Sequence, residues 1–310
     1  MLPFVHRVTK YDPADRDGSG HYTGTEDTDC DDGPVLAAYL AAVRAFAVEA
    51  GVERLAIREP GLGSPDTRLP DGVTAYHDGA EVTLDQAIAL LRGMLRGDEL
   101  FCRLEAEGHF FVHVGWDQYV YVGSAVPCPE AVRRTAGLGL FAERLDCSPC
   151  EPEPEPGEQC PADDRFWARL AAAVADGRVG LLEEAYVQNQ TRWHRLTVPG
   201  LDAVRDGLAP RAQLSAWPGP GEDVAAVLGS LSAEESAELV WEDRDGRLHS
   251  LLVWDEEELA ELPAIAERAR AATVLSLNAD ERKPLLSAVL PDPDGVLRAR
   301  WRTEPGTLDR

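Results

Sequence analysis

Lysine is almost missing from this chain: Lys10 and Lys283 are its two lysines, so arginine carries nearly all of the positive charge. The 30 basic residues are outnumbered by 55 acidic ones, which gives a formal net charge of −25 at pH 7. A field of that sign repels phosphate groups and disfavours generic binding to nucleic acid or to an anionic membrane. A local basic patch can override this effect, but DNA is not an expected partner.

The sequence also lacks the motifs that usually reveal an enzyme. It contains no Gly-x-Ser-x-Gly nucleophile motif, no phosphate-binding loop and no dinucleotide-binding fingerprint. Its seven histidines are scattered along the chain. No residue is therefore predicted to be catalytic. Whether the protein is an enzyme stays open at this point, with a non-catalytic role favoured.

Long apolar segments are missing as well. No run of 18 apolar residues occurs, and residues 1–25 have no apolar core of the kind found in signal peptides. We therefore expect a cytoplasmic protein without a membrane partner. Its six cysteines, at positions 30, 102, 128, 147, 150 and 160, are then expected to be mostly reduced.

Strand-forming residues are concentrated in residues 109–147. In HFFVHVGWDQYVYVGSAVPCPEAVRRTAGLGLFAERLDC, two runs of β-branched and aromatic residues precede a helix that starts at proline and a further extended run. Residues 179–217 and 237–277 follow the same order of strand, strand, helix, strand. The recurrence is either an internal duplication or an accident, because this order is common in α+β folds.

Length and composition bound the domain organisation. A chain of 310 residues with 44% hydrophobic residues is long enough for about two domains with packed cores. The expected fold class is α+β, with two α/β-sandwich domains whose sheets are mostly antiparallel. A ferredoxin-like βαββαβ arrangement, built from repeated ββαβ units, is one arrangement that these domains could take. The predicted division is an acidic N-terminal loop region (1–33), an N-terminal α+β domain (34–150), a Pro/Glu linker (151–163) and a C-terminal α+β domain (164–310).

The end of the chain predicts a hairpin, with LLSAVL and VLRARWR on either side of Pro293-Asp294-Gly295. Its second strand would place Arg298, Arg300 and Arg302 on one face and apolar side chains on the other. These arginines form either a basic stripe for RNA phosphate or an acidic partner, or a set of cations that neutralises nearby carboxylates.

Aromatic side chains on predicted strands are a second group of candidate binding residues: Tyr119, Tyr121, Trp193, His194 and Trp254. If exposed, such rings can stack on unpaired RNA bases. The alternative is that they belong to the core, because Tyr119 and Tyr121 face the opposite way from Val120 and Val122 and one of these pairs must be buried.

The acidic residues 11–33 are a candidate site for Mg²⁺ or Ca²⁺, formed from Asp15, Asp17, His21 and Asp27. An EF-hand is excluded, because Pro13 stands at the first ligand position and Gly24 where the bidentate glutamate belongs. A solvated acidic loop is the alternative.

The cysteines are a candidate zinc site. Cys147 and Cys150 have the two-residue gap of a ligand pair, with Cys128 and Cys160 as further thiolates, but the outer spacings are irregular. Cysteines without a shared function are the alternative.

Several segments resemble a group of actinobacterial proteins of unassigned function that are described as RNA-binding. The segments are YDPADRDGSGHYTGTED, YLAAVRAFAVEAGVERLAIREP, YHDGAEV, VHVGWDQYVYVGS, PADDRFWARL, ELVWEDRDGR and PDPDGVLRARWR. The resemblance covers most of the chain and transfers no catalytic residue. It implies a cytoplasmic protein with an RNA partner, and it argues against zinc because Cys147 and Cys150 are not part of the group's pattern.

Charge and resemblance together lead to a functional expectation. We expect a non-catalytic protein that binds a macromolecule through a sheet face or an inter-domain cleft. A protein partner with a basic surface fits the charge best, and a structured RNA is the variant that the resemblance implies. The competing class is an enzyme that uses a divalent metal ion bound by residues 12–32.

Overall fold

The chain forms two α+β units in a computed structural model. The structure describes residues 2–19, 21–24, 33–64, 66–115, 118–149, 158–232, 234–303 and 308. The first unit comprises residues 1–154 and 187–190, and the second comprises residues 155–186 and 191–310. The division between them at 154/155 falls inside the segment predicted as a Pro/Glu linker, of which residues 151–157 lie outside the described residues.

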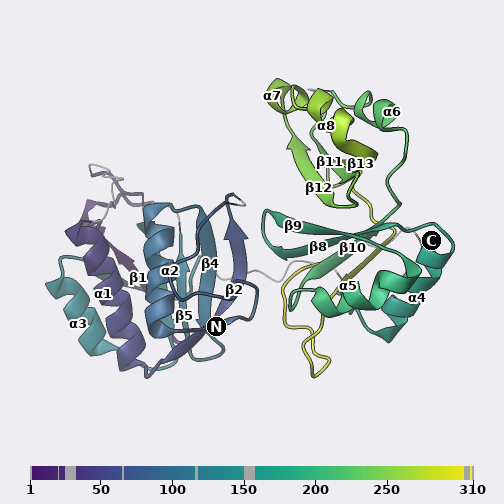
Figure 1. Ribbon diagram of the computed structural model, residues 1–310. Helices are drawn as coiled ribbons and strands as arrows, with labels where there is room; N and C mark the ends of the chain where they lie inside the picture. Colours follow the sequence, from purple (N-terminus) through teal and green to yellow (C-terminus); the bar gives the residue numbers. More distant parts are fainter. Residues whose placement is uncertain are drawn as a thin grey trace. The chain divides into compact units, whose positions relative to one another are not determined.

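The N-terminal unit is built on one seven-stranded sheet with the strand order β3-β2-β4-β5-β6-β1-β7 (Figure 1). Each pair of neighbouring strands is antiparallel. The strands are β1 (Phe4–Thr9), β2 (Arg54–Leu62), β3 (Glu81–Thr83), β4 (Leu100–Ala106), β5 (Phe110–Val114), β6 (Val120–Ser124) and β7 (Phe141–Leu145).

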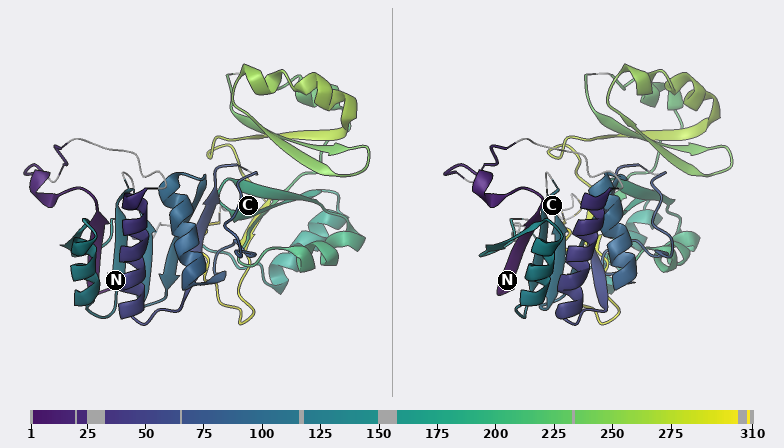
Figure 2. Two further views of the ribbon diagram at one scale, coloured as in Figure 1. Left: turned by 60° about the vertical axis from the view of Figure 1, so that its left-hand side comes forward. Right: turned by 90° about the vertical axis from the view of Figure 1, so that its left-hand side faces the viewer.

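Three helices cover one face of this sheet, as two views show (Figures 1 and 2). They are α1 (Pro34–Glu49), α2 (Leu84–Arg96) and α3 (Pro129–Gly137). Helix α2 begins with a capping box in which Thr83 and Gln86 satisfy each other's backbone N–H groups, and it ends at Gly97 in the left-handed conformation. The apolar spacing of residues 34–50 and 84–95 predicts a helix in each segment, and both helices are present.

The apolar residues that the helices bury determine which sheet face is the core. From α1, Tyr39 and Phe46 are almost fully buried, and alternate residues such as Phe110 and Val122 meet them from the sheet. Strand alternation turns Phe111 and Tyr121 to the other face, where they pack with Val5.

The prediction that residues 1–33 form a loop region is wrong for residues 4–9. These residues form β1, which pairs with β6 on one side and β7 on the other. The segment FVHRVT has the alternation of a strand, but its partners lie more than a hundred residues further along the chain. No turn beside it indicates the pairing. The sequence also predicts a short strand at 73–76, which is not formed.

The C-terminal unit contains two sheets. The four-stranded sheet has the order β14-β10-β8-β9, and the three-stranded sheet has the order β12-β11-β13. The strands are β8 (Leu181–Val187), β9 (Gln190–Arg195), β10 (Gln213–Trp217), β11 (Ala237–Asp243), β12 (Leu248–Val253), β13 (Ala269–Ser276) and β14 (Leu286–Val289). The helices are α4 (Asp164–Ala175), α5 (Leu201–Gly207), α6 (Val224–Leu228), α7 (Glu256–Leu259) and α8 (Leu262–Arg268). Short 3-10 turns occupy Pro13–Asp15 and Val198–Gly200.

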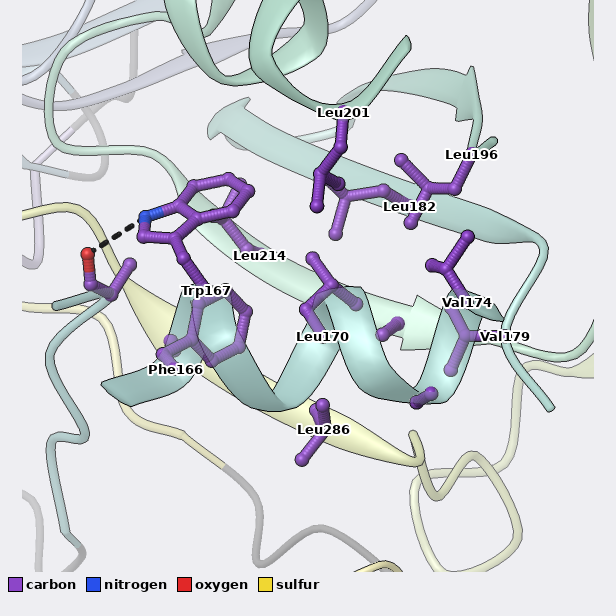
Figure 3. Packing of buried hydrophobic residues seen from close by; sticks show 14 of the residues in the cluster. Phe166, Trp167, Leu170, Val174, Val179, Leu182, Leu196, Leu201, Leu214 and Leu286 are labelled. Atoms are coloured by element: carbon purple, nitrogen blue, oxygen red, sulfur yellow. Dashed lines mark hydrogen bonds between the residues drawn. The ribbon is translucent and has the colours of Figure 1, made fainter. Parts of the chain in front are cut away.

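Helix α4 packs its apolar side onto the four-stranded sheet (Figure 3). Leu170 of the helix lies against Leu182 and Leu214 of the strands, all fully buried. Trp167 fills the end of this core, and its indole N–H donates to the Ala162 carbonyl at 3.0 Å. The three-stranded sheet has a smaller core of its own around Leu239 and Ile265.

The sheets confirm the α+β class and contain the split βαβ arrangement. In the unit β11-β12-α7-α8-β13, strand β11 lies between β12 and β13 and is antiparallel to both, so the two outer strands are parallel. The unit β8-β9-α5-β10 has the same strand order around β8. In the N-terminal pass, β6-α3-β7, the inserted strand is β1, which comes from far away in the sequence. Whether an internal duplication underlies the shared order stays a prediction.

Two sequence predictions fail near the C-terminus. The sequence predicts one helix over 256–270, but the structure divides it into α7 and α8, and β13 begins at Ala269. Residues 296–302 are not a strand, because β14 pairs with β10 and with no second hairpin strand among the described residues. Within the part of the chain that the structure describes, no helix is long and apolar enough to cross a membrane.

Candidate functional site: an acidic groove beside Trp254

A groove of about 440 Å³ lies at one end of the three-stranded sheet, where β11 begins and where β12 and β13 end. Its walls come from three segments of the chain: Glu234–Ser236, Trp254 and Ser276–Asn278, with Glu281 beside the last of these. The backbone joins two of the walls, because the Leu277 N–H donates to the Ser236 carbonyl at 3.1 Å.

Trp254 forms the aromatic side of this groove. It directly follows β12, and 54% of the residue is exposed, which is unusual for so large an apolar side chain. Its position is fixed through the backbone. The N–H groups of Trp254 and Asp255 both donate to the Glu258 carboxylate, at 3.3 and 3.1 Å, as part of the capping box that begins α7. The indole thus lies on an anchored backbone and is accessible to a cation or an apolar group.

The remaining side of the groove is negatively charged. Three carboxylates line it, from Glu234, Glu235 and Glu281. In the described part of the chain, none of these three lies within ion-pair distance of an arginine, lysine or histidine. Helix α7 follows at once with Glu256 and Glu257 in its first turn. Carboxylates without internal counter-ions next to an exposed indole favour a ligand that carries positive charge.

A buried ion network supports the sheet behind this groove. Arg282 donates to Glu183 at 2.8 Å and to Glu238 at 2.7 Å. Each glutamate receives a second hydrogen bond from an indole, Trp217 to Glu183 at 2.8 Å and Trp193 to Glu238 at 2.9 Å. All four carboxylate oxygens therefore have partners, and the network joins β8, β9, β10 and β11 to the turn after β13.

Burial sets the protonation behaviour of this network. Burial raises the pKa of Glu183, and the neighbouring Arg282 guanidinium only partly offsets that effect. Burial acts to lower the pKa of Arg282, but the two carboxylates outweigh it and raise that pKa above its usual value. Because these charges are satisfied by each other, we assign the network a structural role.

Glu183 and its neighbour Glu184 point to opposite faces of β8, as strand alternation requires, so they are not a carboxylate dyad. Glu184 accepts from His194 at 2.7 Å and from the Ala209 N–H at 2.6 Å. Burial acts to raise the pKa of Glu184, yet these two hydrogen bonds hold it below the usual value.

The aromatic candidates on strands therefore divide into two groups. Trp193 and His194 are bound to buried glutamates, and Tyr121 is 5% exposed, which agrees with a packing role for these three. Tyr119 and Trp254 remain more accessible, and they belong to different units.

Tyr119 lies in a cluster of tyrosines and cations in the N-terminal unit. The guanidinium groups of Arg7 and Arg16 lie 5.1 and 5.3 Å from the centre of its ring. Arg16 also donates to the Tyr119 hydroxyl at 3.1 Å. Tyr11 packs edge-on against the ring at 5.8 Å and itself contacts Tyr22 at 4.6 Å.

The C-terminal arginines do not form a stripe on a strand. Arg298 is held by Asp292 at 2.7 Å and by Asp294 at 2.7 Å. Hydrogen bonds from Arg298 lower the pKa of Asp294 to about 2. Arg300 and Arg302 lie on the same non-strand segment, and Gln213 donates to the Arg302 carbonyl. The structure therefore shows that Arg298 neutralises nearby carboxylates, which was the alternative to partner binding.

Of the metal candidates, only Asp17 and His21 lie together among the described residues, with 3.6 Å between Asp17 Oδ2 and His21 Nδ1. The Asp17 carboxylate accepts the N–H groups of Ser19 and His21 at 2.8 and 2.9 Å and so closes a local turn, and Asp15 lies in a 3-10 turn. Asp27 lies outside the described residues. The described residues contain no group of three or more histidine, cysteine or acidic side chains able to hold a metal ion. Cys128 is buried, Cys147 and Cys160 are exposed, and Cys150 is again outside the described part.

One cluster in the N-terminal unit has the residue types of a hydrolase triad. His113 lies 3.4 Å from the Ser148 hydroxyl and 3.4 Å from the Glu105 carboxylate. However, Ser148 is 3% exposed and His113 2%, so a substrate carbonyl has no access to the hydroxyl in this conformation. The stacking of His113 on Phe111 at 4.3 Å agrees with a packing role.

Sequence reasoning named Trp254 but missed the groove beside it. The acidic pairs at 234–235 and 280–281 and the run at 255–258 each follow or precede a strand of the same sheet. Acidic residues next to strand ends were a signal in the sequence, but they indicate a shared groove only when the strand order is known. No protein-family model, no curated protein and no solved structure matches this chain.

Proposed function

We propose that the protein is a non-catalytic binding protein whose C-terminal unit captures a basic segment of a partner protein in the acidic groove beside Trp254. The observation that carries the proposal is the pairing of a 54% exposed indole with three carboxylates that have no counter-ion in the described chain. An arginine or lysine side chain on the indole face would satisfy both at once.

The charge of the whole chain supports a basic protein over a polyanion. A net charge of −25 attracts cationic segments over a distance of about 10 Å at moderate salt and repels phosphate backbones over the same range. Because this attraction is screened, binding is expected to weaken as salt rises.

The structure also bounds the affinity. An exposed cation–π contact contributes about 0.5–1 kcal/mol, and each exposed ion pair contributes up to about 1 kcal/mol. One cation on Trp254 with two or three carboxylates thus gives a few kcal/mol, which corresponds to a dissociation constant near the millimolar range. Contacts outside the groove are needed for tighter binding.

A labelled peptide tests the proposal directly. The probe is a fluorescein-labelled peptide of alternating arginine and serine, with a peptide of alternating glutamate and serine as its counterpart, and the readout is fluorescence anisotropy with the full chain. We expect the arginine peptide to bind and the glutamate peptide not to bind. Trp254→Ala is expected to weaken it about threefold to fivefold, the loss of one cation–π contact.

Charge variants provide the matched control. The double variant Glu235→Gln with Glu281→Gln is expected to weaken binding and to reduce its salt dependence. Glu107→Gln makes the same kind of charge change at the exposed β4–β5 turn of the other unit and is expected to leave binding unchanged. Equal binding of both peptides, or an arginine-peptide affinity that Trp254→Ala leaves intact, would remove the basis of the proposal.

A structured RNA is a second candidate, and the Tyr119 cluster is the observation that favours it. Arg7 and Arg16 lie over the half-buried ring of Tyr119, which could stack on an unpaired base, and Lys10 lies beside the buried ring of Tyr11. The test is a gel shift with a hairpin RNA at two salt concentrations, in which phosphate binding must weaken as salt rises. Loss of the shift in Tyr119→Ala but not in Trp254→Ala would place RNA in the N-terminal unit, and no shift at low salt would end this candidate.

A further inference from the structure

Strand β12 is an exposed edge. The order β12-β11-β13 places it at one side of the three-stranded sheet, and its pairing partner is β11 alone among the described strands. Residues 249, 250 and 252 are exposed, and Leu252 keeps 44% of its surface accessible. An edge of this kind presents backbone N–H and C=O groups that another strand can use.

The register shows which backbone groups point outward. Asp243 N–H donates to the Arg247 carbonyl at 2.9 Å where the β11–β12 hairpin closes. In an antiparallel ladder, alternate residues exchange both hydrogen bonds with the partner strand, and the residues between them point away. Counting from Arg247, the backbone groups of Leu248, Ser250 and Leu252 therefore face outward.

The usual protection of an edge strand is missing from β12. Its sequence, LHSLLV, has no proline, no lysine and no acidic residue, and its pairing with β11 runs from 248 to 253 without a bulge. Natural proteins commonly place one of these features on an exposed edge to prevent pairing with another chain. The open edge also ends at Trp254, where the acidic groove begins.

We propose that the basic partner segment binds as a fourth strand on β12, with an arginine or lysine side chain in the groove beside Trp254. This inference rests on the proposed function and adds the mode of recognition. Backbone hydrogen bonds to 248, 250 and 252 would supply affinity, and the groove would select the positive side chain, as in other cases of β-strand addition. A segment of about six residues, roughly 20 Å long, spans β12.

A second copy of the chain is the competing occupant of the β12 edge, and the negative charge of both copies disfavours it. Each copy carries a net charge of −25. Antiparallel pairing of two β12 strands would place the turn Asp243–Arg247, with two acidic and two basic residues, against the acidic end of the other copy. That turn offers no net positive charge to the carboxylates of the groove, whereas a basic segment does.

Proline at an outward-facing position separates edge pairing from groove binding. Ser250→Pro removes an outward N–H and leaves the hydrogen bonds to β11 in place, while Ser250→Val keeps the N–H and serves as the control. An arginine–serine peptide N-methylated at every second residue makes the corresponding change in the ligand, so the test does not depend on the folding of a variant. The readouts are anisotropy and hydrogen-exchange protection of the β12 amides.

We expect Ser250→Pro and the N-methylated peptide each to weaken binding about tenfold or more, and Ser250→Val to have no effect. The unmodified peptide is expected to protect the amides of 248, 250 and 252 from exchange. If Trp254→Ala weakens binding but proline and N-methylation do not, the groove is used without strand addition and this inference is wrong while the proposed function stands. If the peptide does not bind and the chain is instead a dimer that Ser250→Pro dissociates, the edge belongs to a second copy and both proposals fail.

Discussion

Replacing Arg282 by methionine tests whether the buried ion network stabilises the C-terminal unit. The substitution removes the one cation that Glu183 and Glu238 share, at 2.8 and 2.7 Å, and keeps a side chain of similar length. The side chains of Glu183 and Glu238 are 12% and 4% exposed. Removing one partner from a buried ion pair typically destabilises a protein by about 3–5 kcal/mol, because the remaining charge is left without compensation. We expect a loss of that size at neutral pH, a large part of the usual 5–15 kcal/mol of stability of a folded protein.

The loss is expected to depend on pH. In the wild-type protein, burial already raises the folded-state pKa of Glu183 above its usual value of 4.5. Without Arg282 that pKa rises further. A folded state that binds a proton more readily than the unfolded state gains stability as pH falls through this raised pKa towards 4.5. The difference in unfolding free energy between Arg282→Met and the wild type is therefore expected to shrink on acidification.

Urea unfolding followed by tryptophan fluorescence measures this difference, because Trp193 and Trp217 donate to the two glutamates. Arg268→Met, an exposed change on α8, is the control and is expected to stay within about 0.5 kcal/mol of the wild type. A loss below about 1 kcal/mol, or one that is the same at pH 7 and pH 5, would refute the reasoning. The network would then behave like a solvent-screened surface pair.

Three further predictions concern other parts of the fold. The carboxylate of Glu184 contributes stability that is present above pH 4.5 and lost as pH falls through its lowered pKa, and Glu184→Gln should remove this contribution. In urea unfolding, the unfolding free energy of the variant should therefore fall less steeply on acidification than that of the wild type. An equally steep fall would contradict this. Thr83→Ala removes the N-cap of α2 and should lower the unfolding free energy by about 1 kcal/mol, with Thr83→Ser near the wild type in the same assay. Gly123→Ala would make a methyl group clash with the Phe111 ring, and thermal unfolding is expected to show a loss of about 1–3 kcal/mol. Adding Phe111→Leu to the same chain should restore part of that loss.

Local signals explain why the helices of the N-terminal unit could be predicted. The apolar spacing of residues 34–50, the Thr83–Gln86 capping box and Gly97 act within a few residues of each other, so the sequence contains the whole interaction. The β4–β5 hairpin is also local, because Gly108 adopts the left-handed conformation that its turn requires.

Long-range pairing explains the failures. Strand β1 is defined by its position between β6 and β7, and an extended run at 296–302 stays outside the sheets because no strand pairs with it in the described chain. Strand propensity does not identify the partner of a strand, and a segment that finds no partner does not form a strand. The helix predicted over 256–270 also ends early, at Arg268, because Ala269 begins β13 and pairs with Asp243 of β11.

The sequence by itself determined the α+β class, the helices with capping signals and a charge that disfavours polyanions, because these depend on composition and on neighbours along the chain. Only the tertiary structure decided that Arg282 meets two glutamates from different sheets, that Arg298 is neutralised by Asp292 and Asp294, and that acids from separate segments meet Trp254 at one sheet end. The physical reason is the same in each instance: the energy of a charge depends on which groups lie within a few ångströms, and strand order, not sequence distance, determines those neighbours.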